Sequence, residues 1–229
     1  MANAYRTSLI VGAGPGLGAS LARRLSKSGI AVALAARDPA KLAPLCEEIG
    51  ATAHACDATD PAQVARLFEA VERASGPPEV VAYNASARVR GPLVSLDAEG
   101  VRRALMASAY GAFLVAQRAL PAMLAKGAGA FLFTGASASI KGYAESAPFA
   151  MGKFALRGLA QSMARELAPK GIHVAHFVID GAIRPHGRGD DNDAMLDPDA
   201  IADTYVHVLM QPRSAWTWEV ELRPWVERF

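Results

Sequence analysis

The sequence predicts an α/β fold in which helices cover both faces of a doubly wound, seven-stranded parallel sheet, and three observations support it. Short β-branched or apolar runs alternate with helical patterns, as they do in βαβ units. Hydrophobic residues make up 52% of the 229 residues and charged residues 20%, which suits strands buried on both faces. The first strand pattern ends in a glycine-rich turn that opens a helix. Together these features predict a single-domain Rossmann fold over residues 1–229.

The predicted elements follow one another closely along the chain. Strands are expected at residues 8–13, 30–36, 51–56, 78–84, 129–135, 171–179 and 216–222. Helices are expected at residues 17–28, 39–49, 61–74, 99–126, 146–168 and 198–210. Proline begins several of these helices and glycine ends several, which is typical of both residues. Residues 184–197 are the one irregular stretch, and we expect them to be a mobile loop.

The composition argues against several classes of function. The net charge is +2 and basic residues are interleaved with acidic ones, so we expect neither nucleic acid nor a membrane as partner. No apolar run reaches roughly 18 residues and no apolar signal segment precedes the first strand, which indicates a cytoplasmic protein. His173 and His176 lie three apart on one strand and therefore face opposite sides, so they predict no metal site.

The glycine-rich turn "VGAGPGLG" is the first candidate site. Glycine lets the backbone turn tightly and approach a pyrophosphate, whose charge is favoured by the N–H groups at a helix start. Because the turn follows a strand and precedes an amphipathic helix, it predicts dinucleotide binding, and the alternative is a turn that is merely rich in glycine. The expected cofactor contacts are Gly12, Gly14, Pro15, Gly16, Leu17 and Gly18.

Residues after the next three strands point to the type of dinucleotide. The second strand pattern lacks the acidic residue that would bind a ribose 2′-hydroxyl, and Arg37 stands there instead. A guanidinium can bind a 2′-phosphate in a bidentate manner, so the sequence favours NADP over NAD. Asp57 is expected to meet the adenine and Asn84 the ribose. The alternatives are a solvated turn at Arg37 and ordinary turn caps at Asp57 and Asn84.

Several motifs together resemble the short-chain dehydrogenase/reductase family over essentially the whole chain. They are the spacing Gly12-x-x-x-Gly16-x-Gly18, "YNAS" after the fourth strand, the long helix bearing Lys153, and "GIHVAHFVIDGAI". The resemblance implies a cofactor across the carboxyl ends of the strands and a small-molecule substrate. It also implies a Tyr-x-x-x-Lys pair that works with a Ser and an Asn. In that family the tyrosine exchanges the proton, and the lysine lowers the tyrosine pKa and binds the nicotinamide ribose.

The match to that catalytic pattern is incomplete. Counting back from Lys153 places Phe149 at the tyrosine position, and a phenyl ring has no proton to exchange. The serine of the family falls on Ala136, with the hydroxyls of Ser137 and Ser139 nearby. The asparagine of the family falls on Ser108. The resemblance therefore implies a complete cofactor half joined to an altered catalytic half.

Four residues remain as candidates for the chemistry. Lys153 is expected to bind the ribose, and burial would lower its pKa enough for it to act as an acid. Ser137 is a polar candidate, Tyr143 a possible proton carrier and Asp180 a possible base. Ile183 stands where the family contacts the carboxamide of the cofactor.

Two functions follow from this pattern. The first is an NADP-dependent oxidoreductase with an altered catalytic site that acts on a small carbonyl, alcohol or related substrate. The alternative is a noncatalytic NADP-binding sensor or scaffold protein. The resemblance implies a homodimer or homotetramer, and Trp216 and Trp218, on one face of the last strand, are the candidate subunit contact.

Overall fold

One seven-stranded sheet organises the computed structural model, which describes residues 5–185, 187–190 and 192–227. The strand order is β3-β2-β1-β4-β5-β6-β7, and every neighbouring pair is parallel. This order confirms the predicted doubly wound sheet. The strands are β1 (Thr7–Val11), β2 (Ala31–Ala36), β3 (Thr52–Ala55), β4 (Val80–Tyr83), β5 (Gly129–Thr134), β6 (Ile172–Ile179) and β7 (Glu219–Leu222).

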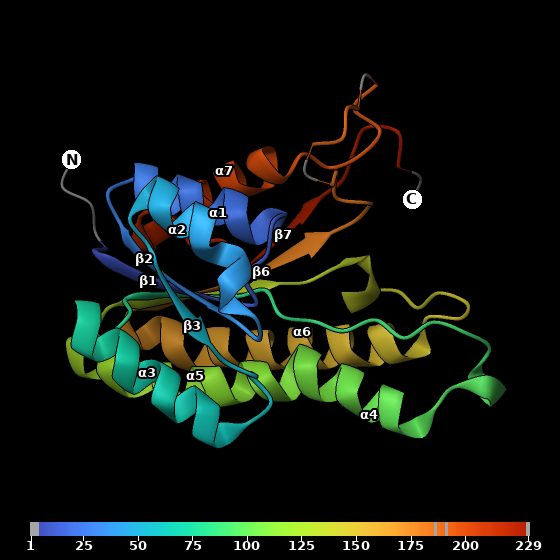
Figure 1. Ribbon diagram of the computed structural model, residues 1–229, viewed down its shortest axis with the longest axis horizontal. Helices are drawn as coiled ribbons and strands as arrows, with labels where there is room; N and C mark the ends of the chain where they lie inside the picture. Colours follow the sequence, from blue (N-terminus) through green and yellow to red (C-terminus); the bar gives the residue numbers. More distant parts are fainter. Residues whose placement is uncertain (1–4, 186, 191, 228–229) are drawn as a thin grey trace.

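Helices cover both faces of the sheet (Figure 1). One layer holds α1 (Leu17–Lys27), α2 (Ala43–Ile49) and α7 (Pro198–Leu209). The other holds α3 (Pro61–Ser75), α4 (Ala98–Leu105), α5 (Gly111–Lys126) and α6 (Ala147–Leu167). A hydrophobic cluster lies between the sheet and each layer. None of the helices that the structure describes is long and apolar enough to cross a bilayer.

The central strands are largely apolar and are covered on both faces. Every residue of β4, β5 and β6 is buried. Phe131 and Phe133 pack into the cluster between the sheet and α5 and α6, whereas Phe177 stacks on Tyr205 of α7 with 3.5 Å between ring centroids. Burying one such side chain stabilises the fold by about 1.5–3 kcal/mol. These strands fix the frame whose carboxyl ends carry the candidate site.

The helix predicted at 39–49 is divided. Residues Pro39–Leu42 form a 3₁₀ turn, and α2 begins only at Ala43. Pro44 has no N–H and cannot make the bond that a continuous α-helix would require at its position, so the chain restarts with proline in the first turn.

The helix predicted at 99–126 contains a π-helical turn at Met106–Tyr110. The buried hydroxyl of Tyr83 donates a hydrogen bond of 2.6 Å to the carbonyl of Ala107, which lies in this turn. Gly111 packs so closely that a Cβ there would meet that same hydroxyl at 2.5 Å. A side chain inserted against the helical ladder is a recognised cause of such a turn. The π-helical turn and the residue after it therefore lie in direct contact with Tyr83, the last residue of β4.

The last strand is shorter than predicted. It begins at Glu219, because the backbone N–H of Thr217 donates to the side chain of Gln211 at 2.7 Å. Trp216 and Trp218 therefore precede the strand. Trp216 stacks on His173 with 4.7 Å between centroids, and Trp218 lies beneath the guanidinium of Arg157. Because neither residue belongs to the strand, the strand alternation that predicted a shared face does not apply to them, and the subunit contact stays a prediction.

The predicted loop at 184–197 is fixed at its base. Ile183 and Leu196 form a parallel bridge, and Arg184 pairs with Asp197 at 2.8 Å. Residues 186 and 191 of this loop lie outside the described residues. The bridge joins the end of β6 to the start of α7, beside the carboxyl edge of the sheet.

Candidate active site

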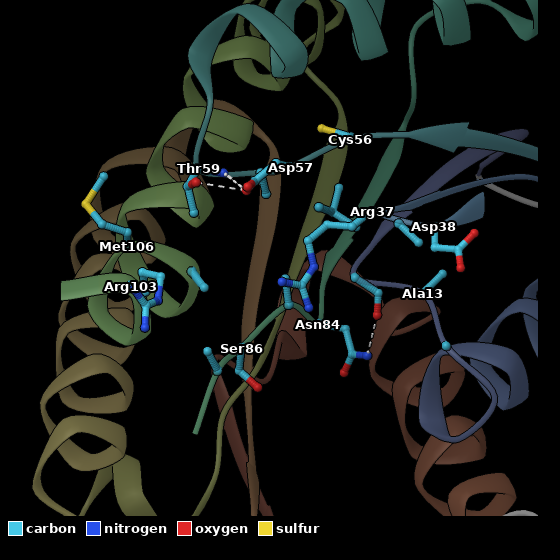
Figure 2. A pocket seen from close by; sticks show the side chains of 18 of the residues that line it. Ala13, Arg37, Asp38, Cys56, Asp57, Thr59, Asn84, Ser86, Arg103 and Met106 are labelled. Atoms are coloured by element: carbon cyan, nitrogen blue, oxygen red, sulfur yellow. Dashed lines mark hydrogen bonds between the residues drawn. The ribbon is translucent and has the colours of Figure 1, made fainter. Parts of the chain in front are cut away.

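A cavity of about 610 Å³ lies at the carboxyl ends of β1, β2, β3 and β4 (Figure 2). Parallel sheets place binding sites at this edge, where the strand order reverses between β1 and β4. Six of the predicted cofactor residues line the cavity: Gly12, Gly14, Pro15, Arg37, Asp57 and Asn84. The position and size suit a nucleotide.

The glycine turn forms one wall of the cavity, and its glycines are required for two different reasons. Gly12 has φ 85°, and a Cβ there would lie 2.5 Å from Ala85 Cα, so this glycine is required by the fold itself. A Cβ at Gly14 or Gly16 would meet no described atom within 4 Å. Leu17 then begins α1, with its first-turn N–H groups at this edge. The open space before a helix start is a cradle that fits a diphosphate.

Basic side chains outnumber acidic ones around the cavity. Arg37 at the end of β2 points into it (Figure 2), and no described carboxylate forms an ion pair with Arg37. Lys41, in contrast, pairs with Asp38 at 3.2 Å. The cavity is lined by the basic residues Arg37, Lys41, Arg102 and Arg103 and by the acidic residues Asp38 and Asp57. Lys41, Arg102 and Arg103 already pair with described carboxylates, so the cation that favours an anionic ligand here is Arg37.

Asp57 and Asn84 support the local backbone as well as lining the cavity. Oδ1 of Asp57 accepts from the N–H and the hydroxyl of Thr59, at 2.9 and 2.8 Å. The side-chain amide of Asn84 donates to the carbonyl of Gly12 at 3.0 Å (Figure 2). Both residues therefore make the turn contacts that were their alternative interpretation, and both remain at the cavity wall.

Several lining residues were missed by the sequence reasoning. Arg102, Arg103 and Met106 reach the cavity from α4 and the π-helical turn that follows it. Their signal was only an amphipathic helix, and nothing local distinguishes the face that meets the cavity. Thr59 and Ser86 could have been found, because each lies two residues beyond a predicted site residue, Asp57 or Asn84.

Lys153 belongs to α6, and its side chain reaches the end of β5. Its side chain is 3% exposed, and Nζ donates to the carbonyl of Thr134 at 2.7 Å. Burial, and secondarily the positive charge of Arg88, lower the pKa of Lys153 to about 7. Phe149, one turn earlier, is also buried, and its ring centroid lies 5.7 Å from Nζ. The lysine is therefore poised to exchange a proton near neutral pH.

The serines near this lysine differ in their surroundings. Ser108, in the π-helical turn, is fully buried, and its hydroxyl has no hydrogen-bond partner among the described residues. It faces Gly152, the residue before the lysine, where a Cβ would lie 2.8 Å from Ser108 Cβ. Ser137 is half-buried at the start of a 3₁₀ turn, Ser137–Ser139. The hydroxyl of Ser139 accepts the N–H of Ala136 at 3.1 Å.

The other candidates have different environments. Tyr143 is 45% exposed, and its ring lies 5.8 Å from Nζ of Lys141. Asp180 is buried, but Oδ2 lies 3.5 Å from Nζ of Lys141 and 3.3 Å from the guanidinium of Arg223. Two cationic side chains therefore already contact this carboxylate. Ile183 packs against the hydrophobic cluster between the sheet and the layer of α1, α2 and α7, and it does not line the cavity described above.

The histidines of β6 have structural partners. Nε2 of His173 lies 2.9 Å from the carbonyl of Thr217. Nδ1 of His176 lies 3.0 Å from Glu219, which also pairs with Arg157 at 2.7 Å. Burial lowers the pKa of His176 to about 4, so it is neutral at pH 7.

Comparison with known proteins agrees with this geometry. A family model described as short chain dehydrogenase matches residues 6–190. The chain belongs to the short-chain dehydrogenase family. A relative in this family is the 3-oxoacyl-[acyl-carrier-protein] reductase MabA of Mycobacterium tuberculosis. It is 34% identical over 178 residues, which cover 78% of this chain and 69% of the reductase.

Solved structures of short-chain dehydrogenases match over nearly the full length. One from Rhodopseudomonas palustris has a TM-score of 0.85 and 36% identity, covering 96% of this chain and 99% of that one. A metagenomic short-chain oxidoreductase in complex with NADP has a TM-score of 0.85 and 28% identity, covering 96% and 97%. The fold prediction is thereby confirmed. Family membership also confirms the prediction of an NAD(P)-dependent oxidoreductase of the short-chain type.

Proposed function

We propose that the cofactor of this protein is NADP and that it occupies the cavity at the carboxyl ends of β1 to β4. The observation that carries the proposal is Arg37, which points into that cavity from the end of β2, where NAD-binding proteins of this fold hold an acidic residue. The surplus of basic side chains supports it further. The metagenomic relative crystallised with NADP is consistent with the choice.

The residues present fit this cofactor. Gly14, Gly16 and the first turn of α1 would hold the diphosphate, since the turn leaves open space there. Arg37 would bind the 2′-phosphate in bidentate geometry. Asp57 would meet the adenine, and Asn84 would stand beside the ribose nearer the nicotinamide.

Lys153 would bind the nicotinamide ribose and hold the proton of the reaction. The bound dinucleotide would supply or accept a hydride. Phe149 stands where the family has its proton-exchanging tyrosine, and the basic side chains of Arg88 and Lys153 lie against its ring. Because the lysine pKa is about 7, its ammonium is an acid strong enough to protonate a developing alkoxide. Ser137 would contribute a polar contact to the substrate.

The substrate would be a small carbonyl compound, alcohol or imine. Proton transfer by a positioned group contributes about 10²- to 10⁴-fold, so a site with a lysine in place of a tyrosine can still support turnover. The test is to incubate the purified protein with NADPH and a panel of carbonyl and imine compounds, and to compare it with Lys153→Ala. Turnover above that variant supports the oxidoreductase.

Tight NADPH binding without turnover, even in Phe149→Tyr, would instead favour the noncatalytic sensor or scaffold. A sensor must prefer one redox form, because a ligand pair bound equally well shifts no equilibrium. Calorimetric titration with NADPH and NADP⁺ measures that preference. Absence of binding to either form would refute the cofactor proposal.

We also propose that the protein is a homodimer or homotetramer. The side chains of Phe113, Met151 and Phe154 on α5 and α6 are each between 43% and 50% exposed, which is unusual for large apolar residues and typical of an interface. Sedimentation velocity measures the assembly, and a monomer at micromolar concentration would contradict it. The cytoplasmic location stays a prediction, which fractionation of expressing cells tests.

A further inference from the structure

Arg88 lies over the ring of Phe149, the residue at the position of the family's proton-donating tyrosine. It lies in the segment after β4, and its Cζ is 4.3 Å from the ring centroid of Phe149. Nζ of Lys153 lies 5.7 Å from the same centroid. A guanidinium over a ring at this distance makes a cation–π contact, which orients it but leaves its five N–H donors available. The proposed reaction site therefore carries an arginine near its lysine.

Positive charge at this place is not balanced by the protein. No carboxylate of the described residues forms an ion pair with Arg88 or with Arg90, two residues further along. Burial and the charge of Arg90 lower the pKa of Arg88, and Arg88 in turn lowers that of Lys153. Asp180, the buried carboxylate of the described chain, is held by Lys141 and Arg223. Arg88 and Lys153 thus place two basic side chains against one aromatic ring, and Arg90 adds a third positive charge that acts on Arg88.

We propose that Arg88, assisted by Arg90, binds a carboxylate carried by the substrate, so that the natural substrate is an oxo acid or the corresponding hydroxy acid. This inference rests on the proposed oxidoreductase function. A planar guanidinium matches a carboxylate in bidentate geometry, and a ligand of that charge relieves the repulsion of Arg88 with Lys153 and Arg90. A neutral ketone would leave that repulsion in place.

The proposal also predicts a coupling between binding and proton transfer. A bound carboxylate offsets the charge of Arg88, which is one of the two causes of the low Lys153 pKa. The pKa governing turnover of an oxo acid is therefore higher than that governing turnover of its ester. Simple packing of Arg88 on Phe149 would produce no such difference.

The experiment compares oxo acids with their methyl esters. Pyruvate, acetoacetate and 4-oxopentanoate, each paired with its ester, are reduced with NADPH by the wild type and by Arg88→Gln, Arg88→Lys and Arg90→Gln. Arg73→Gln is the matched control, since Arg73 is an exposed arginine on α3 in the described structure. Saturation-transfer NMR measures binding of the same acids to the NADPH-loaded protein, and circular dichroism verifies folding.

The expected result is a preference of roughly ten- to hundredfold in kcat/KM for at least one acid over its ester. Arg88→Gln abolishes the preference without changing NADPH affinity, Arg88→Lys keeps part of it, and Arg73→Gln keeps it all. Turnover without an Arg88-dependent preference overturns the carboxylate site and leaves the oxidoreductase intact. Absence of turnover with Arg88-dependent binding of an acid overturns the oxidoreductase and retains the site. Absence of both overturns both, and weaker NADPH binding by Arg88→Gln assigns the arginine to the cofactor instead.

Discussion

Two glycines of the same turn should respond to alanine in opposite ways. At Gly12 a methyl group would meet the backbone of Ala85 at 2.5 Å, and φ is 85°. The left-handed conformation costs about 1–2 kcal/mol for an L-residue. Overpacking against fixed backbone adds about 1–3 kcal/mol. Gly12→Ala should therefore lower the free energy of unfolding by about 2–5 kcal/mol, which corresponds to a fall in Tm of roughly 4–20 °C for a chain of this length.

Gly14→Ala should leave folding intact and impair cofactor binding. A Cβ there meets no described atom within 4 Å, so Tm should stay within about 2 °C of the wild type. The methyl group would enter the space proposed for the diphosphate, and NADPH affinity should fall at least about tenfold, the equivalent of one good hydrogen bond.

Differential scanning calorimetry gives Tm, and quenching or enhancement of NADPH fluorescence gives Kd. Gly158→Ala on α6 is the control, because its Cβ also meets no described atom and alanine favours a helix. It should bind NADPH as the wild type does. If Gly14→Ala bound NADPH normally, the cradle assignment would be refuted. A normal Tm for Gly12→Ala would refute the packing argument.

Three further predictions concern the proposed site. Arg37→Leu should weaken NADPH roughly ten- to hundredfold while NADH affinity stays constant, because the lost contact is to the 2′-phosphate alone; fluorescence titration measures both. The rate of carbonyl reduction should fall as pH rises above about 7, since Lys153 loses its proton there, and Lys153→Met should abolish this pH dependence; stopped-flow rates at saturating NADPH measure it. Phe149→Tyr should raise kcat for carbonyl reduction by about 10²-fold or more, because it would restore a proton-donating phenol on a ring whose centroid lies 5.7 Å from Nζ of Lys153.

Each of these has a control and a contrary outcome. Lys41→Leu removes another cation from the cavity wall, but one already paired with Asp38, so it should change NADPH affinity little. An equal loss for NADPH and NADH in Arg37→Leu would contradict the 2′-phosphate assignment. A flat pH profile in the wild type would remove the lysine as proton donor. Phe149→Leu controls for packing, and if Phe149→Tyr bound NADPH normally but gained no rate, the position would not serve proton transfer.

Local patterns predicted the frame of the protein well. The largely apolar runs of β4, β5 and β6 favour burial on both faces, and such burial requires a layer of helices on each side of the sheet. The Asp60-Pro61 pair also marks a helix start correctly, since Asp60 accepts from the N–H groups of Ala62 and Gln63. Such features depend on neighbours in sequence, so a single chain reveals them.

What the sequence did not reveal depends on contacts between distant residues. The π-helical turn arises because Tyr83 of β4 donates to Ala107, 24 residues away. The position of Arg88 over Phe149 depends on the relative placement of two segments that no local pattern relates. The low pKa of Lys153 was anticipated from burial, but the contribution of Arg88 was not. Charge balance in a site is a property of the folded arrangement.

Thr134, the last residue of β5, joins the two helical layers at the edge of the site. Its carbonyl accepts from Lys153 on α6, while its hydroxyl shares a 2.8 Å hydrogen bond with Tyr205 on α7. Both contacts are buried, so neither exchanges readily with solvent. The ammonium is in this way anchored through the sheet to the opposite side of the molecule. A substitution at Tyr205 is thus expected to change the position of the Lys153 ammonium, although no residue of the layer formed by α3 to α6 has been replaced.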